Sequence, residues 1–314
     1  MPSSSLAPET DSPPHLKAQK TNLPQVTVVV LNWCAEAVTS ACLDSVARLE
    51  YNGYTTLLVD NGSPDGSGEK LHAAFPEIHY LQTGSNLGYT GGNNRGIDWA
   101  LGRGADYVLI VNNDAVLEPD ALSHLVATAE KTQGKVGGVA PKILYRDDPE
   151  RIWYGGGEFS AVRGLGLHWR EGQLDAPGQD HGVHDVTFMT GCCLLLSTEA
   201  LREVGTFDEA FFAYVEDADL SLRLREAGFR MVYQPKARVF HDSLHPGEKP
   251  SPFQIRQRDR GRRRVMRKHF PFWSRTPFLF RFYLTRVILF FLYWMGGEGE
   301  RARAIFDGMG NGRG

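Results

Sequence analysis

Short apolar runs alternate with helix-spaced segments through the first half of the chain. The runs are rich in β-branched and aliphatic residues, which is typical of strands buried on both faces of a parallel sheet. They span residues 25–31, 54–59, 78–81 and 108–111, with helical patterns at 35–49, 69–75 and 120–131. This alternation predicts an α/β fold in which helices flank a mostly parallel twisted sheet.

The pattern becomes less regular after about residue 135. Residues 160–185 are polar and rich in glycine, so we expect a long irregular segment of the kind that forms lids over sites. An apolar run at 186–196 predicts a strand in which Cys192 and Cys193 are buried. Three histidines of the irregular segment are expected to lie in solvent: His168, His181 and His184.

Polar residues follow several of the predicted strands. Asn32 follows the first, Asp60 the second, and Asn112, Asn113 and Asp114 the fourth. Ligands of open α/β sheets bind beyond the carboxyl ends of the strands, so we expect Asp114 to face such a crevice. Its hard oxygen ligands suit Mg²⁺ or Mn²⁺ carrying phosphates. Alternatively, the three residues form a turn before a helix that begins at a proline.

A glycine-rich segment, Asn86–Gly96, precedes a short helical pattern at 97–101. Glycines such as Gly92 let a backbone loop approach a bulky ligand, and the first amides of the helix can face phosphate. The segment has neither the Walker A pattern nor the dinucleotide fingerprint. We therefore expect a nucleotide site, but no ATPase or dehydrogenase chemistry.

A second acidic group lies far along the chain. Glu216, Asp217 and Asp219 begin a helical pattern that runs to about Ala227. Acids at a helix N-terminus favour the macrodipole, but charges this close repel unless a cation or a basic substrate group relieves them. The aromatic residues just before them form either a sugar platform or part of the core: Phe211, Phe212 and Tyr214.

A strand pattern at 230–239 leads to His241. An imidazole at this strand end would complete a metal site if it lay beside Asp114. His245, four residues further, is an alternative ligand, and both histidines can equally be structural.

The charge of the chain is unevenly distributed. The net charge of the 314 residues is −3, yet residues 251–314 hold 14 Lys+Arg against 4 Asp+Glu. A basic tail suits an anionic partner, such as a phospholipid surface or a pyrophosphate-bearing acceptor. Nucleic acid is not an expected partner, because no nucleic-acid module is recognisable. Four cysteines without zinc or disulfide spacing indicate a cytoplasmic protein, and residues 1–23 resemble a disordered leader.

The tail has two parts. Residues 256–268 hold eight basic residues against Asp259, and residues 277–295 are apolar except for Arg281, Thr285 and Arg286. The uninterrupted part, 287–295, is too short to span a bilayer, so we expect an interfacial helix on the inner face of the plasma membrane. The alternative is a helix that packs on the α/β domain or on a second copy in a homodimer.

The ordered series of motifs resembles family 2 glycosyltransferases of the GT-A fold, and specifically the rhamnosyltransferase-like branch. The resemblance covers roughly residues 25–270. It rests on Leu31-Asn32-Trp33, Val59-Asp60-Asn61-Gly62-Ser63, Asn86–Gly96, Asn112-Asn113-Asp114, Thr190-Gly191, Glu216-Asp217-Ala218-Asp219 and His241.

The resemblance implies a role for each matching residue. It implies that Asp114 and His241 bind Mg²⁺ or Mn²⁺ on the donor diphosphate and that Asp217 is the catalytic base. The implied nucleotide-sugar contacts are Asn32, Asp60, Asn86, Gly92 and Asn113. The implied acceptor contacts are Thr190, Gly191, Tyr214 and Glu216. Asn112 stands where many relatives carry an acid, which leaves the number of metal ligands open.

The implied function is an inverting, metal-dependent transfer of a sugar to an acceptor hydroxyl in cell-surface polysaccharide biosynthesis. The branch implies rhamnose from dTDP-rhamnose, a dTDP- or UDP-linked donor, and a glycan or polyprenyl-diphosphate-linked acceptor. We expect a catalytic domain at 24–250, with halves at 24–135 and 136–250, and a helical tail at 251–314. The alternatives are a sugar nucleotidyltransferase and a non-catalytic module that binds a membrane surface.

Overall fold

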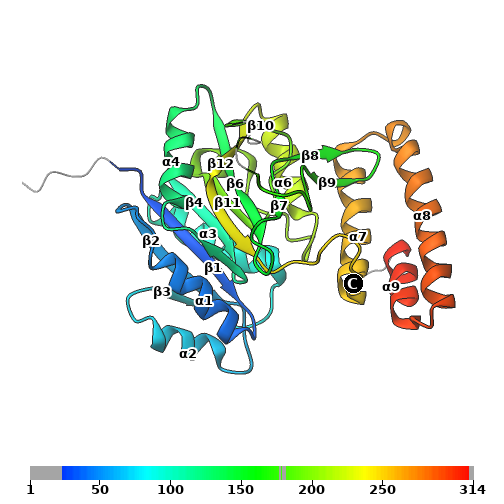
Figure 1. The fold of residues 1–314 in the computed structure, drawn as a ribbon, viewed down its shortest axis with the longest axis horizontal. Helices are drawn as coiled ribbons and strands as arrows, with labels where there is room; N and C mark the ends of the chain where they lie inside the picture. Colours follow the sequence, from blue (N-terminus) through cyan, green and yellow to red (C-terminus); the bar gives the residue numbers. More distant parts are fainter. Residues whose placement is uncertain (1–22, 177, 179–181, 311–314) are drawn as a thin grey trace, which may run out of the picture.

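A computed structural model of the chain describes residues 23–176, 178 and 182–310. A ten-stranded mixed sheet forms its centre (Figure 1). Eight strands follow the order β10-β12-β6-β11-β4-β1-β2-β3, while β5 pairs with β12 and β7 with β6. Strands β8 and β9 form a separate hairpin. The expected leader lies outside the described residues, except for Leu23.

The element boundaries follow the predicted pattern closely in the first half. The strands are β1 Val26–Asn32, β2 Tyr54–Asp60, β3 His79–Gln82, β4 Tyr107–Asn112, β5 Ala115–Leu117, β6 Val136–Tyr145, β7 Ile152–Tyr154, β8 Gly157–Ser160, β9 Leu165–His168, β10 His184–Val186, β11 Cys193–Ser197 and β12 Arg230–His241. The helices are α1 Glu36–Val46, α2 Ser67–Ala74, α3 Gly88–Gly102, α4 Ala121–Lys131, α5 Thr198–Val204, α6 Glu216–Glu226, α7 Pro252–His269, η1 Phe272–Arg275, α8 Thr276–Met295 and α9 Gly299–Met309.

Strands β3, β2, β1 and β4 are parallel, as the alternation predicts. The register places Asn32 opposite Asp60 and Leu31 opposite Asn112. The polar ends of these strands therefore meet at one edge of the sheet. Beyond β4 the sheet becomes mixed, because β11 pairs antiparallel with both β4 and β6, whereas β12 runs parallel to β6.

The prediction of a glycine-rich loop up to Gly96 is wrong, because helix α3 already begins at Gly88. The glycines allow this helix to lie very close to the sheet. A Cβ atom on Gly92 would stand 2.5 Å from Leu31 Cδ1, and one on Gly96 would overlap Val29. Packing, rather than access for a ligand, explains glycine at these two positions.

The expected irregular segment is also wrong in part. The β8–β9 hairpin covers its first part, up to His168, and β10 begins at His184 near its end. His168 is not a solvated residue: its ring centroid lies 4.5 Å from that of Trp153, and burial lowers its pKa to about 4. His184 stacks on Trp169, and His181 lies outside the described residues.

The C-terminal helices form a group of their own. Figure 1 shows α7, α8 and α9 together at one side of the molecule, across the sheet from β2 and β3. Helix α8 is longer than the uninterrupted apolar part at 287–295, because Arg281 and Arg286 lie within the helix without interrupting it. Among the described residues, Phe272–Met295 is long and apolar enough to cross a membrane by length and composition, with a mean hydropathy of 1.5.

Candidate active site

Asp114 and His241 meet at one end of the sheet although they lie far apart in the sequence. Strand β12 pairs antiparallel with β5, and this register places His241 opposite Ala115, next to Asp114. His241 Nε2 lies 3.1 Å from Asp114 Oδ1. The ring of Trp153 covers the imidazole at a centroid distance of 4.5 Å. His245 instead lies 3.0 Å from Asp147, so His241 is the histidine that the fold brings to Asp114.

The Asp114–His241 pair has the chemistry of a partial metal site. His241 Nδ1 is buried and has no hydrogen-bond partner among the described residues, and Asp114 Oδ1 is buried with no hydrogen bond there apart from its close ion-pair contact with His241 Nε2. No cluster of three or more His, Cys, Asp or Glu side chains that could hold a metal occurs in the described part of the chain. Mg²⁺ in transferase sites commonly has one or two carboxylate ligands and takes the rest from phosphate and water. The donor set of one oxygen and one nitrogen fits Mn²⁺ or Mg²⁺ on a diphosphate.

Asn32 and Asp60 lie in a buried polar network at the ends of β1 and β2. Both side chains are fully buried. The Asn32 amide donates to Asp60 at 3.1 Å and to Ser63 at 3.1 Å, and the Gln82 amide also donates to Asp60. Neither side chain exposes an atom to a nucleotide, so in this structure they position the strand ends. A direct contact with the nucleobase or ribose stays a prediction.

Asn86 and Asn113 are more accessible. Asn86 is exposed and accepts a hydrogen bond from the Gly88 amide at 2.9 Å, just before α3. Asn113 is half-buried and donates to Thr39 at 2.9 Å. Gly92, by contrast, faces Leu31 inside the molecule and presents nothing to a ligand.

A strained turn places the second acidic group. Tyr214 and Val215 have φ angles of 68° and 73°, in the left-handed region that a β-branched residue rarely adopts. The turn ends where α6 begins, at Glu216. Helix α7 braces it through Gly261, where a Cβ atom would stand 2.8 Å from the Tyr214 carbonyl oxygen. We call residues 214–217 the acid turn.

Asp217 is the partly exposed carboxyl of the acid turn. Its Oδ2 accepts from the Gly191 amide at 3.0 Å, and its Oδ1 accepts from the Ala218 amide at 2.8 Å. Burial raises the pKa of Asp217 to about 6, although these hydrogen bonds oppose the shift. Glu216 is more deeply buried, and burial together with the charge of Asp217 raises its pKa well above the usual range.

Asp219, in contrast to Asp217, is enclosed by ion pairs within the protein. Its carboxylate is fully buried and lies 2.8 Å from Arg223, Lys268 and His269. Burial alone would raise the pKa of Asp219, but the hydrogen bonds from His269 and Lys268 lower it to about 2. Asp219 therefore joins α6 to α7.

Residues 190–192 connect the two acidic groups. The Gly191 amide holds Asp217, and the Cys192 carbonyl accepts from the Asn112 amide at 2.8 Å, two residues before Asp114. Thr190 and Gly191 are themselves buried. Tyr89 donates to the Gly191 carbonyl at 2.6 Å. Sequence reasoning missed Tyr89 because it lies within a segment that the glycines mark as a loop.

Most basic residues of α7 have internal partners. Arg256 pairs with Asp307, Arg262 with Asp259, and Lys268 with Asp208 and Asp219, while Arg263 donates to carbonyls at the end of α9. Arg258 is exposed and has no ion pair or hydrogen bond with another described residue. It shares a helix face with Gly261, which contacts the acid turn.

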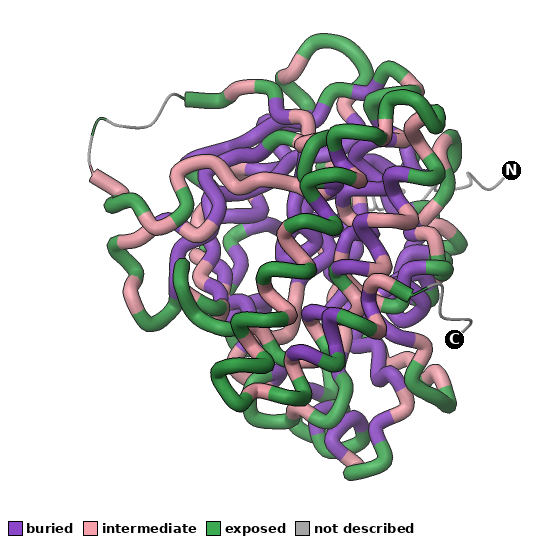
Figure 2. The backbone as a smooth tube through the Cα atoms, turned by 90° about the vertical axis from the view of Figure 1, so that its right-hand side faces the viewer, coloured by how far each residue is buried: buried purple, intermediate pink, exposed green. Residues whose placement is uncertain are grey.

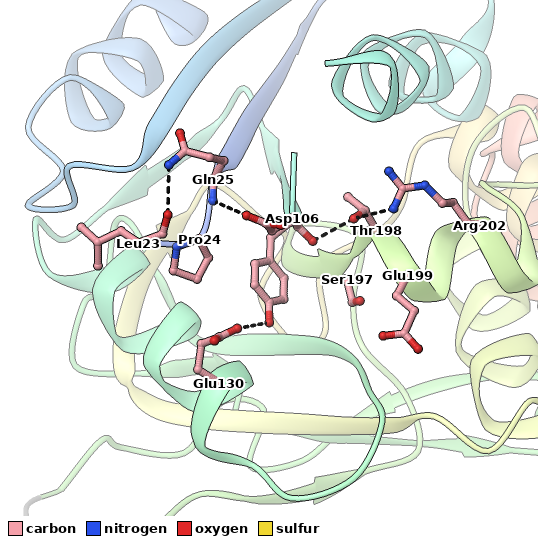
Figure 3. Close-up of a pocket in the computed structure, with 10 residues that line it drawn as sticks. Leu23, Pro24, Gln25, Asp106, Glu130, Ser197, Thr198, Glu199 and Arg202 are labelled. Carbon is pink, nitrogen blue, oxygen red and sulfur yellow. Dashed lines mark hydrogen bonds between the residues drawn. The ribbon is translucent and has the colours of Figure 1, made fainter. Parts of the chain in front are cut away.

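The hollow drawn in Figure 3 is not part of this site. It lies at the other edge of the sheet, where Gln25 precedes β1 and Asp106 precedes β4. Several of its polar groups have partners: the backbone amide of Gln25 donates to Asp106 at 2.7 Å, and the Tyr107 hydroxyl donates to Glu130 at 2.6 Å.

Comparisons with known proteins support the resemblance. The sequence profile described as "Glycosyltransferase like family 2" matches residues 24–264. An N-acetylglucosaminyl-diphospho-decaprenol L-rhamnosyltransferase of Mycobacterium tuberculosis is 34% identical over 210 residues, which are 61% of this chain and 67% of the relative. The hexosyltransferase Agl10 of Haloferax volcanii, from low-salt glycan biosynthesis, is 26% identical over 67% of this chain and 64% of its own length.

Solved structures show the same fold. GalNAc-T7 with UDP, GalNAc and Mn²⁺ has a TM-score of 0.62 at 17% identity, over 79% of this chain but only 48% of that protein. The mannosyltransferase PcManGT of Pyrobaculum calidifontis, with GDP-Man and Mn²⁺, has a TM-score of 0.56 at 14% identity, over 92% of this chain and 86% of its own. The chain therefore belongs to glycosyltransferase-like family 2 and is a glycosyltransferase with the GT-A fold.

Proposed function

We propose that this enzyme transfers a sugar from a nucleoside diphosphate to a hydroxyl of a lipid-linked acceptor, with inversion, in cell-surface polysaccharide biosynthesis. The observation that carries the proposal is the link between Asp217 and Asp114 through residues 190–192. It sets a base of raised pKa beside a partial metal site at the carboxyl edge of the sheet.

Asp217 is the proposed general base. A sugar hydroxyl is a poor nucleophile, so its proton must leave as the bond to the anomeric carbon forms. Displacement in a single step inverts that carbon, because the hydroxyl attacks from the side opposite the diphosphate. Asp217 is the carboxyl of the first turn of α6 that combines partial exposure with a pKa of about 6. Glu216 stays protonated behind it, because burial raises its pKa further.

Asp114 and His241 are the proposed ligands of Mg²⁺ or Mn²⁺. A bound divalent cation would neutralise the charge that develops on the departing diphosphate. The unpartnered His241 Nδ1 and the separation of 3.1 Å between Asp114 Oδ1 and His241 Nε2 support this assignment. Asn86 and Asn113 are the proposed contacts to the donor, because they combine amide groups with partial or full exposure.

Rhamnose from dTDP-rhamnose is the proposed donor sugar, and a polyprenyl-diphosphate-linked GlcNAc is the proposed acceptor. The name of the Mycobacterium tuberculosis relative supports rhamnose as the sugar and a diphospho-polyprenol-linked GlcNAc as the acceptor, whereas dTDP follows from the branch that the sequence resembles. Arg258 supports a phosphorylated acceptor, since its unpaired guanidinium stands near the acid turn and suits phosphate. Four free cysteines, of which Cys34 is exposed, support a cytoplasmic location.

Product analysis with purified full-length protein tests the proposal. We would incubate it with Mn²⁺, GlcNAc-diphospho-polyprenol and a panel of dTDP-, UDP- and GDP-sugars. The expected products are free dTDP and rhamnosylated lipid. Release of pyrophosphate would show a nucleotidyltransferase. If no donor turned over with any acceptor while the protein still bound vesicles, a non-catalytic binding module would replace the proposal.

A further inference from the structure

The outer face of α8 is an exposed apolar surface. Figure 2 views the molecule from the side of α7–α9 and shows exposed residues recurring along the outer helices. Soluble monomers rarely expose contiguous apolar surface of this kind without a partner. We call it the α8 face; its exposed members are Phe280 72%, Leu284 48%, Val287 47%, Ile288 50%, Phe291 51%, Leu292 56% and Met295 69%.

The opposite side of α8 is fixed to the protein in every turn. Phe278 and Phe282 are fully buried in the main core. Arg286 donates to the buried carboxylate of Asp259 on α7 at 2.6 Å. Further along, Leu289, Phe290 and Tyr293 pack against a small cluster that contains Ile255 of α7 and Ile305 of α9.

The charges and aromatic residues around the α8 face are those of a lipid interface. The 20 residues of α8 contain no acid, and Arg281 is exposed among its apolar residues. Trp273, just before the helix, is 78% exposed and Trp294, at its other end, is 64% exposed. Tryptophan and arginine occur together at the headgroup level of anionic membranes.

We propose that α8 lies in the plane of an anionic bilayer, with the α8 face among the acyl chains and Arg281 at the headgroups. This inference deepens the proposed function, because it names the surface that carries the lipid-linked acceptor. It does not depend on the identity of the sugar.

Two other arrangements fit less well. A spanning helix would take α7 and α9 into the bilayer or would break the contact between Arg286 and Asp259, and either step leaves charges without water or partners. A second copy on the α8 face would bury Arg281 where α8 offers no acid to pair with it.

The in-plane arrangement also explains the position of α7. This helix contacts α8 through Asp259 on one side and the acid turn through Gly261 on another. Packed helix axes are about 8–10 Å apart. Asp217 would therefore lie within about one helix of the headgroups, where the diphosphate of a polyprenyl acceptor is held.

Vesicle sedimentation tests the membrane contact. The full-length protein should pellet with vesicles of phosphatidylglycerol and phosphatidylcholine, and less with phosphatidylcholine alone. Leu284→Glu with Ile288→Glu should lower the vesicle partition at least about tenfold, because two half-exposed side chains lose their burial in lipid. The matched control is Leu174→Glu with Val183→Glu, which alters side chains 52% and 51% exposed elsewhere on the molecule.

Donor hydrolysis and melting temperature should be unchanged in both double variants, so a loss of membrane binding is distinguishable from a failure of the proposed reaction. The proposal is overturned if the native protein ignores anionic vesicles. It is also overturned if sedimentation velocity shows a dimer that Leu284→Glu with Ile288→Glu converts to a monomer.

A labelling experiment distinguishes the in-plane helix from a spanning one. Arg303→Cys on a Cys34→Ser background places one exposed thiol on α9, since the other cysteines are buried. In inverted membrane vesicles, whose cytoplasmic face is outward, a membrane-impermeant maleimide should label this thiol without detergent. Labelling that needs detergent would show that α8 crosses the bilayer and would overturn the proposal.

Discussion

The two adjacent carboxyls at the start of α6 differ in burial and in hydrogen bonding. Glu216 is 5% exposed, and its Oε2 has no partner among the described residues. Asp217 receives two backbone amides and remains accessible. Burial therefore raises the pKa of both carboxyls, to about 6 for Asp217 and well above the usual range for the more deeply buried Glu216. Acid–base sites commonly use such a difference between neighbouring carboxyls.

Replacing Asp217 with Asn keeps the shape of the side chain and removes the proposed base. Turnover should fall roughly 10²-fold or more, within the scale of general-base catalysis, while the dissociation constant for dTDP stays unchanged. In the native enzyme turnover should rise with pH through about 6, because only the deprotonated carboxylate accepts the proton. Initial rates between about pH 5 and 8 and calorimetric titration with dTDP measure both. A flat pH profile would remove Asp217 from this role.

A second prediction concerns metal binding by Asp114 and His241. Asp114→Ala and His241→Ala should each weaken Mn²⁺ binding in the presence of dTDP, because each removes one of the two proposed protein ligands. Electron paramagnetic resonance of free Mn²⁺ measures this without any turnover. His245→Ala is the matched control, since His245 pairs with Asp147 instead. Full activity in excess chelator, or equal losses in all three variants, would contradict the assignment.

Arg258 is predicted to recognise the acceptor phosphate. Arg258→Ala should raise the KM for the diphosphate-linked acceptor at least about tenfold, because a hydrogen bond to a charged group contributes about 1.5–3 kcal/mol. Arg267→Ala is the control, since Arg267 is also exposed but lies on the opposite side of α7. Measuring the KM for the acceptor and the affinity for dTDP shows whether Arg258 binds the diphosphate of the acceptor or that of the donor. A change in dTDP binding alone would assign Arg258 to the donor.

At the scale of elements, the sequence predicts strands more reliably than it predicts what glycine does. The β-branched run that forms β1 permits one interpretation, because such residues suit a strand buried on both faces. Glycine permits two, since it serves open loops and close helix packing alike. Gly92 and Gly96 belong to the second class because Leu31 and Val29 lie directly opposite. That contact depends on the sheet, which local sequence does not describe.

Two glycines of α3 should respond in opposite ways to the same substitution. Gly96→Ala forces a methyl group into Val29 and should destabilise the protein by about 1–3 kcal/mol. Gly102→Ala, in the same helix, meets nothing within 4 Å and should stabilise it by about 0.5–1 kcal/mol. Urea denaturation measures both. Equal effects would mean that α3 does not pack on β1 as described.

At the scale of the whole molecule, the excess of basic residues in the tail does not show that several of them form ion pairs within the protein. Sequence counts assign the eight basic residues of 256–268 to an external partner. Several of them instead join α7 to α6 and α9, through Asp219 and Asp307. Such pairs join residues far apart in sequence, so composition alone does not show them. The sequence predicts that Asp114 and His241 come together, because each follows a strand, and the structure places them 3.1 Å apart. Tyr89 and Arg258 could be recognised only from the fold.

The C-terminal helices are part of the folded unit, so their removal should not yield an independent catalytic domain. A chain ending at Arg275 loses Phe278 and Phe282 from the main core and leaves the buried carboxylate of Asp259 without Arg286. Arg262 still pairs with Asp259, so the main loss is the two core phenylalanines, each of which contributes about 3–5 kcal/mol when removed from a core. The shortened protein should therefore melt at a markedly lower temperature or fail to fold, as calorimetry and circular dichroism would show. Leu284→Glu with Ile288→Glu changes the same helix on its outer face alone and should keep the native melting temperature. If the shortened chain melted like the native protein, α8 would be an appendage whose inner face contributes nothing to the fold.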